Sequence, residues 1–521
     1  MMKVKVISAD PDDIRVICDL MRIYFPDLNY TNQENKGALS GTSFLTSDDS
    51  TDQAEDNAEV NADNNIDDNA AITLKVEKTE SPLEVKVILD IAGKEYVQSE
   101  GVQAERFAEE NTNRKRRLLR LALHQLMQQA FCLEPSPWGI LTGVRPTKII
   151  HRFIDEGIGE EGSKLHLTRD YGISPKRANL LWDVASFQHP LLLNKEDVPK
   201  LVSLYIGIPF CPTRCHYCSF PAFSLKQWGH KLEDYLLGLE REIRTVGTSL
   251  SETGVQVQTV YIGGGTPTIL SVTQMENLLK SLTESFRFVV GRELTVEGGR
   301  PDTLTREKLR VLKEYGVNRL SINPQSMREE TLVAIGRKHS VQEIISAYEL
   351  AREEGLPIIN MDLIIGLPGE NCPVLENTLH EVLKLGPENI TLHALAMKRA
   401  AFYRQEKIKL PLPAEGKAMM DLAHDTLQKA GYLPYYLYRQ REIFAHGENV
   451  GYSLPGKACL YNIQMMEERQ TIWGFGVGSG SKFVHQENWT LENIYNPKDI
   501  IFYLERLDQI IEKKVVKLQS I

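Results

Sequence analysis

The sequence predicts an α/β protein whose core is a partial, open (β/α)6 barrel, joined to a small N-terminal α+β domain, a helical region and a C-terminal mixed region. Two observations support this prediction. Six apolar or β-branched runs recur between residues 202 and 392, and amphipathic helical patterns separate them. Strands that alternate with helices form a parallel sheet, and six such units make only part of an eight-fold barrel. The predicted domains are 1–110, 111–199, 200–395 and 396–521.

The first domain is predicted to be an α+β unit that an insertion interrupts at a loop. A strand and then a helix begin it, with apolar residues at Val4, Val6, Ile14, Ile17 and Met21. Two further strands are expected at 72–78 and 83–91. Residues 31–71 are rich in Asn, Asp, Ser, Thr and Ala, and the stretch from Asp48 to Asp68 contains nine acidic residues and no Lys or Arg. Because such a segment buries too little apolar surface to offset its ordering entropy, we expect a disordered insertion.

Residues 111–199 are predicted to be helical. A basic run begins one helix and consists of Arg114, Lys115, Arg116, Arg117 and Arg120. Leu119, Leu123 and Leu126 recur at helical spacing in this helix and suit a buried face. We interpret the basic run as a solvated helix face, with contact to RNA as the alternative. Another helix is expected to begin at Ser174-Pro175, because Ser is a good N-cap and Pro fits the first turn.

The barrel strands are predicted at 202–208, 258–262, 293–296, 318–322, 358–365 and 389–392. The helix after the first strand carries one apolar stripe, formed by Leu232, Tyr235, Leu236, Leu239 and Ile243. A later helix begins with a capping box of Ser340 and Glu343 and ends at Gly355. The region from residue 396 onward contains many tyrosines and a glycine-rich stretch, and we expect its last helix at 498–513.

Composition narrows the range of functions. The formal charge of −10 gives no broad basic field for nucleic acid, and most of that charge belongs to the acidic insertion. The sequence contains no run of about 18 apolar residues that would predict a transmembrane helix. Its first residues lack the apolar segment of a signal peptide. We therefore expect a cytoplasmic protein without a membrane partner.

Three of the seven cysteines lie within eight residues, at Cys211, Cys215 and Cys218, directly after the first barrel strand. The other four are Cys18, Cys132, Cys372 and Cys459. Thiolates are the usual ligands of iron–sulfur clusters, and the C-x3-C-x2-C spacing can hold three irons of a [4Fe–4S] cube. The fourth iron would then be open to a substrate-like ligand. Buried thiols without a metal, or a zinc site that lacks a ligand, are the alternatives.

Polar and glycine-rich motifs follow the next strands. GGGTPT at 263–268 follows the second strand, where glycines let the backbone approach a ligand closely and donate N–H groups. It is either a tight turn or, beside the cysteines, a site for the methionyl part of S-adenosylmethionine (SAM). Glu297, Gln325 and Asp362 lie at later strand ends. Asp362 needs a partner inside the barrel, and Arg337 is suited to bidentate pairing with a carboxylate. Structural ion pairs are the alternative for these residues.

Taken in order, these motifs resemble the oxygen-independent coproporphyrinogen III oxidases (coproporphyrinogen dehydrogenases), a radical SAM family. The matching segments are Y-x5-C-x3-C-x2-C at 205–218, GGGTPT, Glu297, RLSINPQS at 319–326 and MDLIIGLPGE at 361–370. Three further segments are similar to the longer HemZ-type branch, namely PWGILTGVRPTKI at 137–149, GENVGYSLPGK at 447–457 and NIQMMEERQTIWGFGVGSGSK at 462–482.

The resemblance implies a role for each matching residue. Cys211, Cys215 and Cys218 would bind the [4Fe–4S] cluster, whose open iron takes the amino and carboxylate groups of SAM, and together with Tyr205 they form the implied catalytic set. Tyr205, Gly264 and Glu297 match positions that contact this SAM. Further positions match contacts to SAM, including a second molecule found in the better-known branch, and they are Tyr217, Gly265, Thr266, Gln325, Arg337, Asp362 and Ile364.

The resemblance also implies a reaction in haem biosynthesis. One-electron reduction, from a donor such as flavodoxin or ferredoxin, would cleave SAM to a 5′-deoxyadenosyl radical. This radical would abstract hydrogen from a propionate β-carbon, and loss of CO2 and one electron would leave a vinyl group. Two such events convert the tetrapyrrole coproporphyrinogen III to protoporphyrinogen IX.

The chain departs from the better-known branch at two positions near the cysteines. Gly207 replaces a His, and Phe220 replaces a further Cys. In addition, Asn323-Pro324-Gln325 replaces Gly-Val-Gln. These changes do not affect the residues matched to the cluster and the first SAM. They put in doubt whether a second SAM binds and how the porphyrinogen is bound.

The C-terminal region is expected to supply part of the substrate pocket. The implied substrate carries four carboxylates, which cationic side chains would bind. The candidates are Lys398, Arg399, Arg439, Arg441 and Arg469, near Tyr435, Tyr436, Tyr438 and Tyr452. Gly474–Gly480 is interpreted as a close-packed turn, because it lacks the surroundings of a dinucleotide site. Two other functions remain open: a haem-binding or haem-delivery protein on a radical SAM scaffold, and a radical SAM enzyme that modifies RNA.

Overall fold

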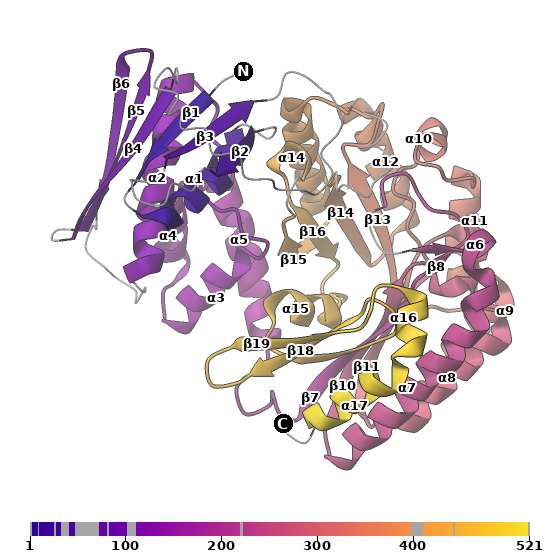
Figure 1. Ribbon diagram of the computed structural model, residues 1–521. Helices are drawn as coiled ribbons and strands as arrows, with labels where there is room; N and C mark the ends of the chain where they lie inside the picture. Colours follow the sequence, from indigo (N-terminus) through magenta and orange to yellow (C-terminus); the bar gives the residue numbers. More distant parts are fainter. Residues whose placement is uncertain are drawn as a thin grey trace. The chain divides into compact units, whose positions relative to one another are not determined.

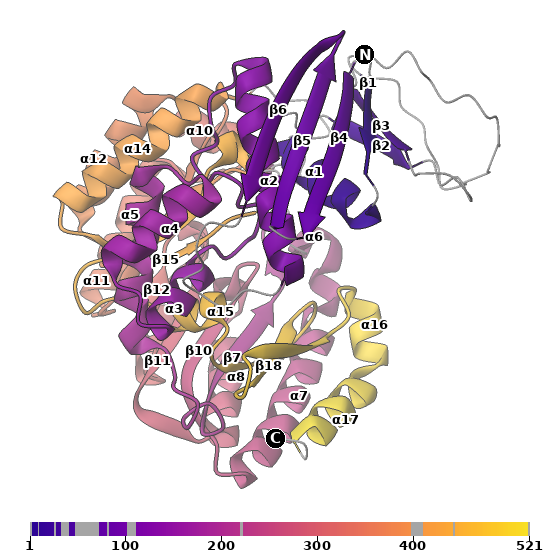
Figure 2. The same ribbon diagram turned by 90° about the vertical axis from the view of Figure 1, so that its left-hand side faces the viewer.

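The computed structural model describes residues 3–8, 10–24, 28–32, 41–46, 72–80, 83–101, 111–218, 222–396, 410–440 and 443–518. The chain divides into two compact units (Figures 1 and 2). The first comprises Met1–Gly143 with Ile149–Trp182, and the second comprises Val144–Lys148 with Asp183–Ile521. Across the described ranges, no helix combines the length and the apolar character that crossing a bilayer requires.

The described residues of the first unit form a six-stranded sheet in the order β2-β3-β1-β4-β5-β6. Its strands are β1 (Lys3–Ile7), β2 (Leu28–Asn32), β3 (Gly41–Thr46), β4 (Ile72–Glu80), β5 (Leu83–Ile91) and β6 (Lys94–Gly101). Only the β1–β4 pair is parallel among the pairs described. Helix α1 (Pro11–Tyr24) lies between β1 and β2 in the chain. After β6 come α2 (Asn111–Phe131), α3 (Thr147–Asp155), α4 (Glu160–Tyr171) and α5 (Pro175–Gln188).

Helix α2 packs on β5 and β6 and contacts α1 (Figure 2). Leu119, Leu123 and Leu126 are fully buried, which confirms the face that the sequence predicts. The sequence patterns did not predict strand β6. Its residues alternate between exposed and half-buried, so it has no continuous apolar face, and it pairs with β5 through its backbone as an edge strand.

Part of the predicted disordered insertion is a strand. Strand β3 lies within residues 31–71 and pairs antiparallel with both β1 and β2, with Thr42 opposite Val6 and Asn32. The expectation of disorder is therefore wrong for residues 41–46. Composition averaged over the segment does not report the backbone hydrogen bonds that stabilise a strand between two others. Residues 31 and 32 belong to β2, and the rest of the predicted insertion lies outside the described residues.

The second unit contains the predicted barrel strands in one sheet, as consecutive parallel neighbours. They are β7 (Leu201–Ile208), β10 (Gln256–Gly264), β11 (Phe288–Glu297), β12 (Arg319–Ser321), β13 (Ile359–Ile365) and β14 (Asn389–Ala394). The connecting helices include α7 (Leu232–Glu252), α8 (Val272–Ser285), α9 (Arg306–Glu314), α10 (Glu329–Ala334), α11 (Val341–Glu353) and α12 (Cys372–Leu385). The partial (β/α)6 barrel that the sequence predicts is confirmed (Figure 1).

Local sequence signals set the helix limits. The capping box of α11 is formed, since Ser340 Oγ accepts from the Glu343 N–H at 3.2 Å and Glu343 Oε2 accepts from the Ser340 N–H at 2.7 Å. The stripe on α7 is buried at Tyr235, Leu236 and Leu239. Short strands β8 (Phe210–Cys211) and β9 (Phe223–Ser224) pair in parallel after β7, and α6 (Leu225–Trp228) follows.

The C-terminal region extends the barrel sheet at both edges (Figure 1). Strands β15 (Leu433–Tyr438) and β16 (Asn449–Ser453) add antiparallel beside β14, whereas β17 (Thr471–Phe475) adds parallel beside β7 and leads to β18 (Gly480–His485) and β19 (Thr490–Tyr495). The helices here include α14 (Pro413–Lys429), α15 (Leu460–Glu467), α16 (Ile500–Glu505) and α17 (Leu507–Leu518). The single helix predicted at 498–513 is thus two helices, separated at Arg506.

The glycine-rich stretch is the tight connection between β17 and β18. Gly476 and Gly478 have φ of 89° and 69°, a backbone conformation that residues with side chains rarely adopt. A Cβ at Gly474 would stand 2.6 Å from the Gly480 carbonyl oxygen. The expected close-packed turn is therefore present.

Helix α15 is held against the barrel strands by a buried charge pair. The Glu293 carboxylate accepts the Leu460 and Tyr461 N–H groups at 2.8 and 2.9 Å, and Arg319 Nε lies 3.7 Å from it. An anion at a helix N-terminus is favourable because the first N–H groups lack partners within the helix. This contact brings the Tyr461 ring onto Tyr261, with centroids 4.7 Å apart, in a group of buried residues that supports the site above it.

Candidate functional site

The three clustered cysteines lie on the loop that follows β7. Its two ends are held together, because the Phe223 N–H donates to the Pro209 carbonyl at 2.7 Å. Within the loop, the Cys218 N–H donates to the Cys215 carbonyl at 3.1 Å. Cys211, Cys215 and Cys218 form no disulfide bonds, and the three residues are partly exposed. They are therefore accessible to iron at the carboxyl end of the first barrel strand, where barrel enzymes place their chemistry.

The arrangement of the thiols suits a cluster better than a single metal ion. In the part of the chain that the structure describes, no three His, Cys, Asp or Glu side chains are placed so that they could hold one ion. A tetrahedral zinc site needs every thiolate about 2.3 Å from the same atom. In a [4Fe–4S] cube each thiolate binds a different iron, so the sulfurs need not converge on one atom. The three thiolates are the kind of donor that the predicted cluster needs.

Two side chains from neighbouring strand ends donate to these sulfurs. Thr266 Oγ1 lies 3.5 Å from Cys211 Sγ, and Arg300 Nη2 lies 3.4 Å from Cys215 Sγ. Burial opposes ionisation of Cys215, but the guanidinium groups of Arg337 and Arg300 outweigh this effect and lower the pKa of the thiol. Arg300 carries no sequence signal, because nothing in Gly-Gly-Arg-Pro-Asp distinguishes it from a surface arginine.

The glycine motif serves the protein's own backbone. The N–H groups of Gly265 and Thr266 donate to the carbonyls of Ile208 and Phe210 at 2.9 and 2.8 Å, and the Gly264 N–H donates to the Glu297 carboxylate at 3.1 Å. A Cβ at Gly265 would stand 2.5 Å from the Phe210 carbonyl oxygen. Three N–H groups of the motif are therefore engaged within the protein, and contact between the motif and SAM stays a prediction. The glycines let the loop after β10 close against the cysteine loop.

Glu297 is a partly buried carboxylate among aromatic rings. Its Oε1 accepts from the Tyr261 hydroxyl at 2.7 Å, and the Tyr261 ring stacks on Tyr205 with centroids 6.4 Å apart. Burial raises the pKa of Glu297 to about 7, although the bonds from Tyr261 and Gly264 favour the ionised form. Burial likewise raises the pKa of the Tyr205 phenol. This carboxyl group can therefore change protonation near neutral pH.

Arg337 joins the cysteine loop to the end of β12. Its guanidinium is 6% exposed, donates to the Tyr217 hydroxyl at 3.2 Å and donates to the Asn323 carbonyl. The bidentate pairing with a carboxylate that the sequence suggests is absent among its described partners. Arg337 instead brings a buried positive charge next to the thiolates.

Gln325, Asp362 and Ile364 come together across β13. The Gln325 N–H donates to the Asp362 carbonyl at 2.9 Å, and the Gln325 carbonyl accepts the Ile364 N–H at 3.0 Å. Gln325 has φ of 69°, and its buried side-chain Oε1 has no hydrogen-bond partner within the described residues. Backbone strain of this kind costs about 1–3 kcal/mol and tends to occur at functional sites. The Gln325 side chain is thus held in place with an acceptor available.

Asp362 has the partners that a carboxylate on a barrel strand needs. Asn360 Nδ2 donates to its Oδ1 at 2.7 Å, and His393 Nε2 lies 3.8 Å from its Oδ2. Burial would raise the pKa of Asp362, but the interactions with His393 and Asn360 outweigh it and keep this pKa below the usual value. The side chains of His393 and Asp362 remain 27% and 21% exposed although they lie on the central strands β14 and β13. Solvent therefore reaches this pair of side chains.

The C-terminal cations lie differently from expectation. Arg439 is buried, and its guanidinium donates to the carbonyls of Gly447 and His446 at 3.3 and 3.4 Å. Arg469 lies over the Trp489 ring, 4.8 Å from its centroid. Of the tyrosines, the Tyr438 hydroxyl lies 3.4 Å from His393 Nδ1 and so borders the pair of His393 and Asp362. The remaining cationic candidates, Lys398, Arg399 and Arg441, and also Phe220, fall outside the described residues.

Two of the HemZ-type segments meet in the second unit. Thr147 Oγ1 donates to Glu467 Oε1 at 2.8 Å, and Arg145 Nη1 lies 2.7 Å from Glu468 Oε1. Burial raises the pKa of Glu467 to about 7. The segment at 144–148 is therefore bound to the end of α15, the helix that supports the tyrosines beneath Glu297.

Known proteins are similar to this chain in sequence and in fold. Residues 205–382 match the family described as the radical SAM superfamily. The chain is 44% identical to the oxygen-independent coproporphyrinogen-III oxidase-like protein HemZ of Bacillus subtilis, over 74% of this chain and 77% of that protein. It is 31% identical to the heme chaperone HemW of the same organism, over 53% and 70% of the two chains. The solved structure of coproporphyrinogen III oxidase (HemN) from Escherichia coli, a radical SAM enzyme, matches with a TM-score of 0.50 and 27% identity, over 60% and 69% of the two chains.

Proposed function

The chain belongs to the radical SAM superfamily and, within it, to the HemZ-type family of oxygen-independent coproporphyrinogen-III oxidase-like proteins, and on this basis we propose that it converts coproporphyrinogen III to protoporphyrinogen IX by oxidative decarboxylation. Its cofactors are a [4Fe–4S] cluster and SAM, which the family uses. When bound and reduced, the cluster would cleave SAM to the 5′-deoxyadenosyl radical that starts the reaction.

The observation that best supports this proposal is the set of contacts around the cysteine loop. Thr266, Arg300 and Arg337 tie the loop to the ends of β10, β11 and β12. Glu297 ends β11, Gln325 follows β12, and Asp362 lies within β13. A cationic ligand such as SAM would meet the Glu297 carboxylate, and Gln325 Oε1 offers an acceptor that the described residues leave unused. The stacked rings of Tyr205, Tyr261 and Tyr461 exclude water from one side.

The proposed substrate is a tetrapyrrole, and the proposed partner is a small electron-donor protein such as flavodoxin or ferredoxin. Three of the residues matched to contacts with SAM, including a second molecule, bond within the protein, since Tyr217 and Arg337 bond to each other and Gly265 bonds to Ile208. Counting the SAM bound per cluster distinguishes one molecule from two.

Heme delivery is the second candidate, because the chain is 31% identical to a heme chaperone. The deciding experiment mixes reconstituted, reduced protein with SAM, coproporphyrinogen III and an electron acceptor under anaerobic conditions. We expect a divinyl product and two CO2 per substrate molecule. Cleavage of SAM without CO2, together with tight haem binding, would support delivery instead and overturn the proposed reaction.

The affinity for SAM is expected to rise with pH through about 7. Below this value Glu297 is protonated, and above it the carboxylate attracts the positively charged ligand, so the ionised form should bind SAM more tightly. Glu297→Gln should flatten this dependence and weaken binding above pH 7 at least about tenfold, a free-energy change of about 1.4 kcal/mol. Equilibrium dialysis with labelled SAM at pH 6 and pH 8 measures the effect, with iron content as the control for folding. Equal pH dependence in both proteins would contradict the assignment.

Arg300→Gln is expected to make the cluster harder to reduce. A buried cation that donates to Cys215 Sγ favours the more negative, reduced cluster, because hydrogen bonds and charge near the sulfurs set its potential. We expect at least a tenfold shift in the reduction equilibrium, about 59 mV for one electron. An EPR-monitored redox titration measures it, and Arg306→Gln, which removes a surface partner of Glu353, is the control. An unchanged potential at full iron content would show that Arg300 serves only the fold.

A further inference from the structure

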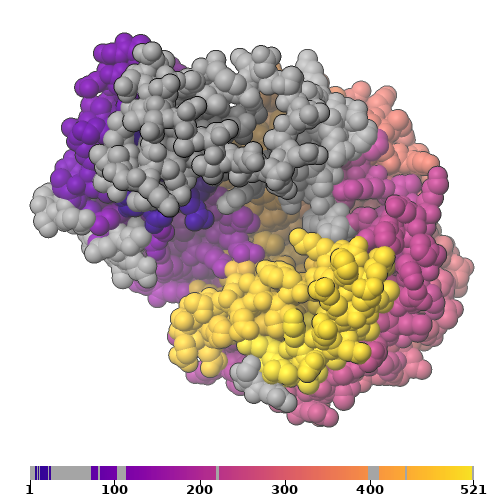
Figure 3. Space-filling model, viewed as in Figure 1, coloured from indigo at the N-terminus to yellow at the C-terminus, as the bar shows by residue number. Residues whose placement is uncertain are grey.

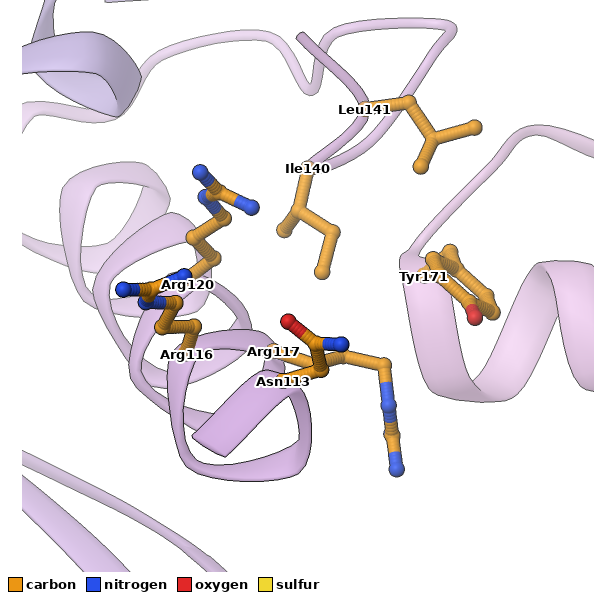
Figure 4. A pocket seen from close by; sticks show the side chains of 7 residues that line it. All are labelled: Asn113, Arg116, Arg117, Arg120, Ile140, Leu141 and Tyr171. Carbon is orange, nitrogen blue, oxygen red and sulfur yellow. The ribbon is translucent and has the colours of Figure 1, made fainter. Parts of the chain in front are cut away.

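The first unit contains a pocket that has no part in the proposed reaction. Its volume is about 210 Å3, and one helix supplies most of its polar lining through Asn113, Arg116, Arg117 and Arg120 (Figure 4). Ile140 and Tyr171 form the opposite, apolar side. All of these residues belong to the first unit, so the pocket is complete within it.

The arginines are placed where their charges are unfavourable without an anion. They lie in the first half of α2, whose first turn contains no acidic residue. Like charges four residues apart on a helix repel each other. Arg116 and Arg120 stand in that relation, and Figure 4 shows their side chains on the same side of the pocket. A bound anion would offset this repulsion.

Acidic side chains of α1 neutralise these charges only in part. Arg116 Nη2 lies 2.8 Å from Asp12 Oδ2, but the two side chains are 39% and 60% exposed, so the pair contributes little. Asp19 attracts Arg120 electrostatically, and the buried Nε of Arg120 has no hydrogen-bond acceptor within the described residues. A bound anion would add the close partner that Arg120 lacks there.

The apolar side of the pocket is formed before any ligand arrives. The Ile140 N–H donates to the Tyr171 carbonyl at 2.9 Å, which fixes the loop to the end of α4. The Arg117 guanidinium lies over the Tyr171 ring, 5.8 Å from its centroid. A ligand that enters between α2 and this wall therefore meets cations on one side and a flat apolar surface on the other.

We propose that this pocket binds a small phosphorylated ligand, with its phosphate on Arg116 and Arg120 and a planar group against Ile140 and Tyr171. The planar fork of arginine matches phosphate oxygens, and two guanidinium groups can hold one phosphate. With a volume of about 210 Å3, the pocket suits a ligand or ligand fragment much smaller than a complete tetrapyrrole. This site is separate from the SAM chemistry and does not depend on it.

Titration calorimetry of the reconstituted full-length protein tests the proposal, with AMP as the probe and with inorganic phosphate, coproporphyrin III and a short single-stranded RNA as comparisons. We expect saturable AMP binding at millimolar or lower concentration that weakens as salt increases. Arg120→Gln and Arg116→Gln should each lower the affinity at least tenfold. Arg15→Gln, which removes the same charge from an exposed position of α1, should change it less than twofold.

The comparison ligands decide between the alternatives. Weaker binding of inorganic phosphate at the same arginines supports the role of Ile140 and Tyr171. Coproporphyrin binding that depends on Arg120, without AMP binding, would show a carboxylate site and overturn the proposal. RNA binding without saturable AMP binding would show that the helix face binds a nucleic-acid backbone instead. Equal AMP affinity in wild type, Arg120→Gln and Arg116→Gln would also overturn it. Iron content and circular dichroism show whether each variant is folded.

Discussion

Anaerobic reconstitution of the Cys211→Ser, Cys215→Ser and Cys218→Ser variants is expected to give protein without an iron–sulfur cluster, whereas the wild type should hold about four irons and four sulfides. The three thiols lie on a loop that Thr266, Arg300 and Arg337 fix to the strand ends, so no other cysteine can take the place of a missing ligand. Iron and sulfide analysis and the visible absorption of the cluster measure the loss.

The remaining cysteines provide matched controls. Cys18→Ser, Cys132→Ser, Cys372→Ser and Cys459→Ser should keep their iron. Cys459→Ser is the most demanding of these, because the buried Cys459 thiol donates to Glu293 Oε1 at 3.2 Å and a hydroxyl can replace that bond. Loss of iron from any of these four variants at normal circular dichroism would show that the ligand set is wrong.

Lys514→Met is expected to lower the free energy of unfolding by about 3–5 kcal/mol, because it leaves a buried carboxylate without its cation. Lys514 and Glu242 are both fully inaccessible to solvent, and Lys514 Nζ lies 2.5 Å from Glu242 Oε1. The same carboxylate accepts from the Gly476 N–H at 2.9 Å and the Tyr503 hydroxyl at 2.7 Å. The pair therefore joins α17, α16 and the turn after β17 to α7 of the barrel.

Denaturant unfolding followed by circular dichroism measures this loss. Lys513→Met, on the exposed face of the same helix, should change the free energy of unfolding by no more than about 0.5 kcal/mol. Adding Glu242→Gln to Lys514→Met should recover part of the loss, since an amide still accepts hydrogen bonds without a buried charge. A loss below about 1 kcal/mol in Lys514→Met would show that water reaches this pair.

Features that depend on near neighbours in the chain could be predicted. The barrel strands, the stripe of α7 and the capping box of α11 follow from periodicity and from residues within four positions of each other. The same holds for the cysteines, whose spacing alone suggests a cluster. Strand β6 and the strand at residues 41–46 were not predicted. An edge strand and a strand in a polar segment are stabilised by backbone pairing, which side-chain patterns do not reveal.

Residues that act on the site from a distance could not be predicted. Arg300 reaches Cys215 across 85 positions of the chain, and His393 reaches Asp362 from the neighbouring strand. Such residues carry no local signal, since an arginine after a strand or a histidine within one is usually structural. The bonds of the glycine motif to the carbonyls of Ile208 and Phe210 could not be predicted either, because these acceptors belong to another segment of the chain.

The sequence by itself determined the partial barrel, the cysteine spacing and the family, because each is encoded in short patterns along the chain. Only the tertiary structure decided which side chains surround the sulfurs and which arginines remain available. Arg439 is engaged by backbone carbonyls and Lys514 by Glu242, whereas the buried Nε of Arg120 has no hydrogen-bond acceptor among the described residues. The physical reason is that a charge takes its role from its surroundings, and folding assembles these from segments that are far apart in the sequence.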